Sequence, residues 1–308
     1  MTCILECASI PYIGYQTFNW FVCHKLYKRK KPLKIMMIME NPTFLYEEMK
    51  WPEIKEVITE DRVVIIPVAT LEDHGHHLPI NTDVAITSTI CRKAAERISG
   101  ETILLPPQYH GYSPHHLDFP GPITIDGPIF IEFMRNVTKS LVHHGFKRIL
   151  LVNGHGSNEP WLDTIARLTN VDHPNTLCAT LSWWAIPEVA ESVNEIRTSE
   201  KGGMSHAGEL ETSMMLAIQP ELVNMSKAVK DISYQISKYF PHDDFYYPPG
   251  PVRMMPYWST ISKTGVMGDP TVATKEKGDI WLEAAIKGLI GIIRDFKNLE
   301  IRERVDHH

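Results

Sequence analysis

Short apolar runs alternate with helical patterns from about residue 60 to the end of the chain. Four compact runs rich in β-branched and other apolar residues predict buried parallel strands, at residues 62–69, 102–105, 148–152 and 176–184. Apolar residues at helical spacing follow or separate these runs and predict helices over residues 82–98, 128–144, 159–168, 207–217 and 275–296. This alternation predicts an α/β fold, a single domain with one mostly parallel sheet and helices on both of its faces.

The pattern also divides the chain into three segments. We expect residues 1–40 to be a poorly ordered extension, residues 41–300 to form the α/β domain and residues 301–308 to be a polar tail. An apolar stretch at residues 3–23 leaves a membrane anchor open as an alternative, although polar residues interrupt it and the basic run follows it, opposite to a signal peptide. Residues 219–274, rich in proline and aromatic residues, predict a long irregular segment that acts as a lid or a subunit contact.

Composition narrows the class of protein. Of the 308 residues, 43% are hydrophobic and 22% charged, which is ordinary for a globular chain. The formal net charge of −6 provides no basic field, so we expect neither nucleic acid nor a membrane as a partner. The five cysteines include no CxxC pair, which argues against a disulfide framework and favours the cytoplasm as location.

The segment directly after the first predicted strand is rich in metal-binding residue types. Glu72, His74 and Asp83 lie within twelve residues there, and Gly75 allows the loop to turn so that they converge. Carboxylates and imidazoles together suit zinc, manganese or iron, and one carboxylate can bridge two ions about 3.5–4 Å apart. The alternative is a solvated loop that happens to be rich in histidine, because E-x-H is a short pattern.

A second group follows the third predicted strand, where Gly154 and Gly156 flank His155. Glycines beside a ligand permit close approach of the backbone. The alternative is a strand-to-helix turn in which an Asn or Ser caps the next helix. Because the carboxyl ends of parallel strands share one edge of the sheet, His155 is expected near the first group, which favours a binding site.

Two further segments carry candidate chemistry. His206 with Glu209 or Glu211, at the start of a helix, is able to complete a metal shell or to act as an acid–base pair, although acidic residues also favour a first helical turn for electrostatic reasons. Residues 111–121 follow the second strand and offer Ser113 and His116 as substrate contacts.

Other motifs bear on the substrate site and on the function class. The Trp183–Trp184 pair at the end of the fourth strand is either core or a platform on which a flat substrate stacks. The sequence contains neither a glycine-rich phosphate loop nor a G-x-S-x-G elbow, which argues against nucleotide-binding and serine-hydrolase classes.

Together these motifs resemble the creatininase (creatinine amidohydrolase) family from about residue 60 to residue 290. Four segments agree in order: E-x-H-G-x-H-L-P-x-x-x-D at 72–83, N-G-H-G-x-N at 153–158, H-A-G-x-x-E-T-S at 206–213 and G-x-x-G-D-P at 265–270. The resemblance implies a creatininase-like fold, a small-molecule substrate and a homo-oligomer, often a hexamer in that family.

The resemblance also implies two divalent ions per subunit, zinc, manganese or iron. Glu72, Asp83 and His155 would hold one ion, His74 and Asp83 the other, and His206 would be catalytic. Creatininase has a further metal-binding glutamate where this chain has Ser157, so Glu211 is the possible substitute.

The implied activity is hydrolysis, by a metal-activated water, of an amide, formamide or cyclic amide, which are carbon–nitrogen bonds other than peptide bonds. Since Ser157 departs from creatininase, the formylaminopyrimidine-nucleotide deformylase and mycofactocin peptidase branches of the family are alternatives. An alternative of another class is a catalytically silent metal-binding scaffold.

Overall fold

A computed structural model describes residues 43–232, 239, 244–246 and 251–308. The expectations for residues 1–40 lie outside these residues, as does part of 219–274. Contacts group Asn41–His308 into one compact unit. Within the described part of the chain, no helix is both long and apolar enough to span a bilayer.

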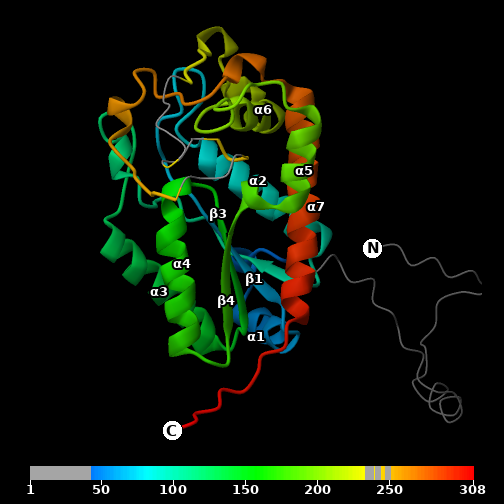
Figure 1. Cartoon of the computed structure of the whole chain (residues 1–308). Coiled ribbons are helices and arrows are strands. Elements are labelled where there is room, and N and C mark those ends of the chain that lie inside the picture. The colour runs from blue at the N-terminus through cyan, green and yellow to red at the C-terminus, as the bar shows by residue number, and fades with distance from the viewer. Residues whose placement is uncertain (1–42, 233–238, 240–243, 247–250) are drawn as a thin grey trace, which may run out of the picture. The chain divides into compact units, whose positions relative to one another are not determined.

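A four-stranded parallel sheet forms the centre of this unit, in the order β2-β1-β3-β4 (Figure 1). All three pairs of neighbouring strands are parallel. The strands are β1 (Val63–Val68), β2 (Thr102–Leu104), β3 (Arg148–Asn153) and β4 (Leu177–Ser182). β1, β2 and β4 lie within stretches predicted from the sequence, and β3 extends one residue beyond its predicted stretch, because an apolar run buried on both faces has few other solutions.

Helices cover both faces of the sheet, which confirms the predicted α/β fold (Figure 1). On one face lie α2 (Thr82–Arg97), α5 (Pro187–Ile196), α6 (Glu209–Ile218) and α7 (Lys275–Asn298). On the other lie α1 (Trp51–Thr59), α3 (Gly127–His144) and α4 (Glu159–Asp172).

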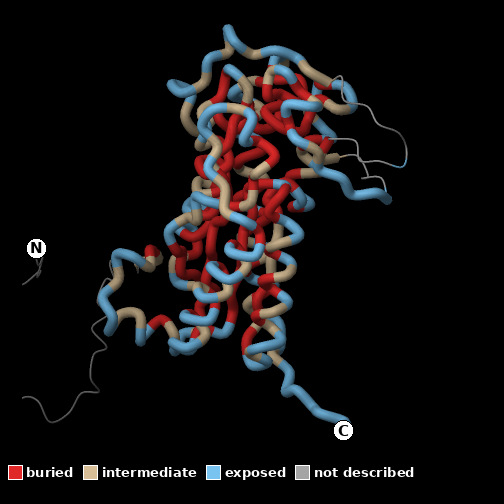
Figure 2. Tube along the Cα trace, turned by 90° about the vertical axis from the view of Figure 1, so that its left-hand side faces the viewer, coloured by how far each residue is buried: buried red, intermediate tan, exposed pale blue. Residues whose placement is uncertain are grey.

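Side chains of the central strands alternate between two apolar cores. In β1, Val63 and Ile65 join the core under α2 and α7, whereas Val64, Ile66 and Val68 join the core under α3 and α4. This is the period-two alternation of a strand, here with both sides buried. Figure 2 shows the buried residues running through the middle of the unit between exposed outer surfaces.

The strand order places a topological switch point between β1 and β3. The chain leaves β1 for β2 on one side through α2, and later reaches β3 on the other side of β1. Loops that leave the carboxyl ends of two such strands separate and open a crevice, where ligands bind in open α/β sheets. The first two candidate groups of the sequence follow these two strands.

Two helices were not predicted from the sequence, α1 and α5. Both are short, with nine and ten residues, and each buries only one or two side chains fully, so their apolar pattern is brief. In residues 219–274 the described part contains only short 3-10 turns, in agreement with an irregular segment.

The core predicts the effect of two substitutions on one helix. Phe130 in α3 is fully buried, whereas Phe133, in the same helix, is 43% exposed. We expect Phe130→Ala to lower the unfolding free energy by about 3–5 kcal/mol, since it leaves a cavity. The matched change Phe133→Ala should cost less than about 0.5 kcal/mol. Chemical denaturation measures both; equal losses would contradict this assignment of the core.

Candidate metal centre

The loop after β1 brings two candidate ligands to the switch point, and α2 adds a third. Glu72 and His74 are fully buried in this loop, and Asp83 is buried in the first turn of α2. Gly75 has a φ of 65°, a left-handed conformation that glycine adopts without strain, and it lies between His74 and the rest of the loop. His155 lies two residues after the end of β3 and is buried beside them.

Glu72 uses its two carboxylate oxygens differently. Oε2 accepts hydrogen bonds from Ser113 Oγ at 2.6 Å and Thr70 Oγ1 at 2.9 Å. Oε1 is buried and accepts no hydrogen bond from the described residues, although His155 Nδ1 lies 3.1 Å away. The hydroxyls therefore fix the carboxylate in place and leave one oxygen for another partner.

Asp83 lies between two imidazoles. Its Oδ1 is 3.0 Å from His74 Nε2, and its Oδ2 is 3.4 Å from His155 Nδ1. Thr70 Oγ1 also donates to Oδ2 at 3.0 Å, so one hydroxyl contacts both Glu72 and Asp83. Each oxygen of Asp83 thus faces a different histidine, the arrangement that a carboxylate shared between two ions requires.

Glu211 reaches the same group from α6. Its Oε2 accepts a hydrogen bond from the backbone of Ala207 at 2.6 Å and lies 3.8 Å from His74 Nε2. Ala207 has a φ of 54°, uncommon for a residue with a side chain, and strain of this kind gathers at functional sites. This turn joins His206 to the helix that carries Glu211.

His206 has a defined tautomer. Its Nε2 lies 2.6 Å from the backbone oxygen of Asp73, which only accepts hydrogen bonds, so Nε2 carries the proton. Nδ1 then has a free lone pair, and it lies 3.6 Å from Glu72 Oε1. Burial, assisted by the neighbouring His74, holds the pKa of His206 well below its ordinary value, so this ring is neutral.

The charges of the other groups are strongly coupled. Burial opposes protonation of His74 and His155, but the carboxylates of Asp83 and Glu72 outweigh it and raise the pKa of each imidazole to about 10. Burial also raises the pKa of Glu211 to about 7. Burial would raise the pKa of Glu72 too, but nearby imidazoles hold it well below its ordinary value. Without a metal ion, protons on the imidazoles balance the carboxylates.

The donor set fits divalent metal ions. Three overlapping groups have ligand atoms within 4.8 Å of one another: Glu72, His74 and Asp83; His74, His206 and Glu211; and Glu72, His116 and His206. Glu72 Oε1 and His155 Nε2 are buried without a hydrogen bond in the described structure. Buried polar atoms normally have partners, and carboxylates with imidazoles are the ligands that zinc, manganese and iron accept.

A cavity of about 100 Å³ opens onto these residues. Glu72, Asp83, His155, His206 and Glu211 line it on one side, and its other walls include aromatic and apolar side chains, those of Trp184, Phe245, Met255 and Trp258. Phe245, Met255 and Trp258 belong to residues 219–274, so the irregular segment contributes to the cavity wall. The lining of the cavity therefore combines ionisable polar side chains with aromatic and apolar ones.

The structure separates the candidate substrate contacts. Trp184 lines the cavity and stacks on Phe245 with ring centroids 4.9 Å apart, whereas Trp183 is packed in the core and does not line it. Both residues lie in a 3-10 turn, Trp183–Ala185, that follows β4, and successive residues of such a turn point in different directions. Ser113 does not line the cavity either, because its hydroxyl is bonded to Glu72. His116 lines it.

Ser157, at the position of the expected glutamate, also lines the cavity. Its hydroxyl lies 3.1 Å from His115 Nε2, and both residues are buried. Burial, with the neighbouring His116, lowers the pKa of His115 to about 3, so this pair is neutral. A neutral hydrogen-bonded pair thus occupies the place where a negative ligand was expected.

An ion pair holds the cavity wall against the loop before His206. Asp244 accepts two hydrogen bonds from Arg197, at 2.6 and 3.0 Å, and one from the backbone of Gly202 at 2.8 Å. The next residue, Phe245, donates its backbone N–H to Met204 at 2.8 Å. The carboxylate of Asp244 therefore connects the apolar wall of the cavity to the loop that precedes His206.

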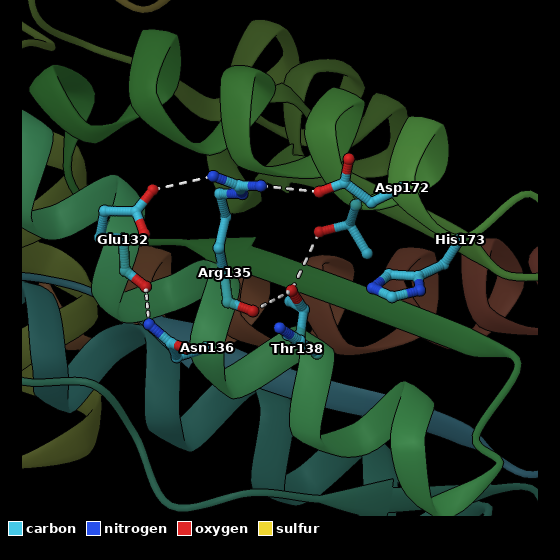
Figure 3. A pocket seen from close by; sticks show the side chains of 8 residues that line it. Glu132, Arg135, Asn136, Thr138, Asp172 and His173 are labelled. Carbon is cyan, nitrogen blue, oxygen red and sulfur yellow. Dashed lines mark hydrogen bonds and ion pairs between the residues drawn. The ribbon is translucent and has the colours of Figure 1, made fainter.

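A larger cavity of about 230 Å³ lies between α3 and α4 and shares no lining residue with the first (Figure 3). There Arg135 pairs with Glu132 at 2.8 Å and Asp172 at 2.7 Å, and Thr138 bonds Thr169. The charged side chains of this larger cavity mostly form ion pairs with one another, and none of the candidate metal ligands lines it. We therefore assign the candidate site to the smaller cavity.

Sequence reasoning missed several residues of the site. Thr70 and Asp73 lie beside predicted ligands, but their roles depend on contacts with Asp83 and His116 that no local pattern encodes. Trp258 and Phe245 come from an irregular segment in which nothing marks a wall residue. Proximity to the E-x-H motif was the one available signal, for Thr70 and Asp73.

The fold and the site define a class: an α/β protein with buried carboxylate and imidazole ligands at the switch point of a parallel sheet. Within this class the family is established by a direct match. Residues 47–293 match the creatininase family model, described as creatinine amidohydrolase, and the chain belongs to this family. It is therefore a creatininase-family hydrolase.

Characterised relatives differ in what they act on. The chain is 28% identical to the creatinine amidohydrolase of Pseudomonas putida over 80% of this chain and 95% of that protein. It is 26% identical to the 3-dehydro-scyllo-inosose hydrolase of Thermotoga maritima, over 83% and 85% of the two chains. It is 27% identical to the mycofactocin precursor peptide peptidase of Mycolicibacterium smegmatis, over 70% and 78%.

Solved structures support the same fold. The crystal structure of a creatinine amidohydrolase matches with a TM-score of 0.70 at 26% identity, covering 84% of this chain and 99% of that one. A manganese creatininase and a mutant creatininase of Zn-Zn type match with TM-scores of 0.68 and 0.69, both at 26% identity over 82% of this chain and 98% of theirs.

The protonated imidazoles predict a proton release on metal binding. His74 and His155, with pKa values raised to about 10, carry protons at neutral pH that an ion must displace. We expect about two protons to be released from these imidazoles, and about half a proton more from Glu211 with its pKa of about 7, when both ions bind at pH 7. The apparent affinity should fall as the pH is lowered from about 10. Calorimetric titration with zinc in buffers of different ionisation enthalpy measures this number. His76→Ala, an exposed histidine, is the control, and heat that does not depend on the buffer would contradict the prediction.

Proposed function

We propose that this protein is a metal-dependent amidohydrolase that cleaves the carbon–nitrogen bond of an amide, formamide or cyclic amide in a small molecule. One observation carries the proposal: the two oxygens of Asp83 face His74 and His155 separately, 3.0 and 3.4 Å away. A carboxylate shared in this way is what two-metal hydrolytic sites use. The family match and the buried donor groups support the same reading.

The donor groups divide into two sets around Asp83. Glu72, Asp83 and His155 would hold one ion, and His74, Asp83 and Glu211 the other, with Glu211 taking the place of the glutamate that Ser157 replaces. When bound, the ions supply Lewis acidity that acidifies a water molecule and polarises a carbonyl group. The rest of the chemistry falls to the side chains of this chain.

His206 is the proposed acid–base residue. Its neutral ring has a lone pair at Nδ1 near Glu72, while the bond from Nε2 to Asp73 keeps the ring in that orientation. Nδ1 accepts the proton of the attacking water, and the imidazolium then delivers it to the leaving nitrogen. Glu72 stabilises the imidazolium between these two steps, because its carboxylate faces the same atom.

The cavity suits a small, flat substrate. Among its described lining residues there is no lysine or arginine, and Trp184, Phe245 and Trp258 form its apolar walls. Aromatic walls offer contact area to a planar amide, and a cavity of about 100 Å³ suits a small molecule. We keep a small-molecule substrate, a homo-oligomer and a cytoplasmic location as proposals.

Ser157 favours a second candidate within the family. Because its hydroxyl pairs with His115, this side of the cavity is neutral, where the resemblance to creatininase requires a carboxylate ligand. The N-G-H-G-x-N form of the motif resembles the formylaminopyrimidine-nucleotide deformylase and mycofactocin peptidase branches. This single difference in residue type therefore supports a formamide or a short peptide over creatinine as substrate.

The first test combines metal analysis with activity. We expect the purified protein to contain about two zinc, manganese or iron ions per chain, and to hydrolyse creatinine or a formamide only without chelator. The preferred substrate then distinguishes the branches. A protein that gains no metal on reconstitution and hydrolyses none of these compounds would favour the silent scaffold.

Variants of the ligands sharpen this test. Glu72→Ala and Asp83→Ala each remove a charged ligand, and turnover should fall to background in both. His76→Ala, at an exposed position of the same loop, should retain wild-type turnover. Equal loss in all three variants would argue against these ligands.

His206→Ala tests the acid–base step. Removal of a general acid–base group typically lowers the rate about 10²–10⁴-fold, and we expect kcat to fall in this range while both metal ions are retained. Metal analysis and steady-state kinetics on the same sample separate the two effects. Wild-type kcat in this variant would exclude His206 from proton transfer.

A further inference from the structure

His116 is a buried imidazole in the cavity that neither proposed ligand set uses. It ends a 3-10 turn, Pro114–His116, between β2 and α3, and only 1% of it is exposed. Trp258 stacks on its ring with centroids 4.7 Å apart and planes at 25°, so the ring has one orientation. The position of His116 beside the carboxylates is therefore fixed by packing.

Asp73 fixes the tautomer of this ring. Its Oδ1 lies 2.7 Å from His116 Nδ1, and a carboxylate only accepts, so Nδ1 donates. With Nδ1 as the donor, Nε2 is the nitrogen available to bind a metal ion, and it lies 3.7 Å from Glu72 Oε1. Asp73 lies between Glu72 and His74 in the chain, so the loop that carries two ligands also orients this imidazole.

The distances around Glu72 suit a shared ion. From Glu72 Oε1, the buried oxygen without a hydrogen bond, His155 Nδ1 is 3.1 Å away, and His116 Nε2 is 3.7 Å away. Ligand atoms about 2 Å from a tetrahedral ion lie roughly 3.3 Å from one another. Both nitrogens are therefore close to the separation that ligands of one ion require.

His206 Nδ1 is 3.6 Å from the same oxygen, so distance alone does not choose between the two histidines. The hydrogen-bond partner of the second ring nitrogen distinguishes the two histidines. His116 donates to a carboxylate, His206 to the backbone oxygen of the same residue, Asp73. A carboxylate partner raises the basicity of an imidazole ligand, and carboxylate–histidine–metal arrays are a recurring form of metal site.

We propose that His116 is a protein ligand of the ion held by Glu72, and that Asp73 is the positioning residue that orients it. This inference rests on the proposed metal centre and adds a ligand to it. The first ion would then be bound by Glu72, Asp83, His155 and His116, and His206 would stay free for proton transfer. His116, expected from the sequence to contact substrate, thereby acts on the substrate through the metal.

Metal affinity tests this assignment without any need for turnover. The probes are zinc, titrated against a chromophoric chelator, and cobalt, whose visible absorption reports the ligands around it. His116→Ala removes the ligand, and His116→Gln removes it but keeps a similar volume and a donor for Asp73, in case the first variant does not fold. Asp73→Asn keeps an acceptor but loses the charge.

We expect one of the two ions to bind about 100-fold more weakly or worse in both His116 variants, with a changed cobalt spectrum. Asp73→Asn should weaken the same ion about 10–100-fold, the usual effect of losing a partner behind a ligand. His206→Ala and the exposed-site control His76→Ala should bind both ions as the wild type does.

Two results would overturn the assignment. Wild-type affinity and an unchanged cobalt spectrum in both His116 variants would exclude His116 alone, and so would a loss of metal in His206→Ala that the His116 variants do not share. A wild-type protein that binds no ions would overturn the proposed function as well. The assignment of His116 is therefore tested by the variants, and the proposed function by the wild type.

Discussion

A fully buried carboxylate at the edge of the sheet sets the terms for the whole site. Removing a charge from water is costly unless partners compensate for it, and Glu72 has them on every side. Two hydroxyls hold one oxygen, while imidazoles surround the other. The parallel sheet makes this possible, because the loops after β1 and β3 leave the switch point together. The fold positions the charge, and the charge dictates which neighbours the loops must supply.

The fold was largely readable from the sequence because the strands are buried on both faces. Runs such as residues 62–69 have almost no polar residues, and a strand in the middle of a parallel sheet is the structure that accounts for them. The helices α1 and α5 were not predicted because each buries few side chains and is less than about three turns long. Tertiary contacts, which no local pattern records, stabilise such helices.

The residues proposed as ligands could be selected from the sequence for a different reason. Glu72, His74, Asp83 and His155 follow strand ends, and strand ends of a parallel sheet meet, so the structure brings them within a few ångströms of one another. The pairing of Asp73 with His116 was not readable, since it joins residues 43 positions apart through side-chain geometry. Nor could the sequence choose between Trp183 and Trp184, because the two lie in a 3-10 turn after β4 that the strand pattern did not predict.

The ligand groups come from distant parts of the chain, from residues 72–83, from His155 and from Glu211 in α6. An ion held by them would be a cross-link between the sheet edge and the helices α2 and α6 on one face of the sheet, and the chain could not unfold without releasing it. When the free concentration of such an ion is 100 times its dissociation constant, binding adds about 2.7 kcal/mol to the unfolding free energy. The heat tolerance and cellular lifetime of this protein would then follow the metal supply of the cell, even while no substrate is present.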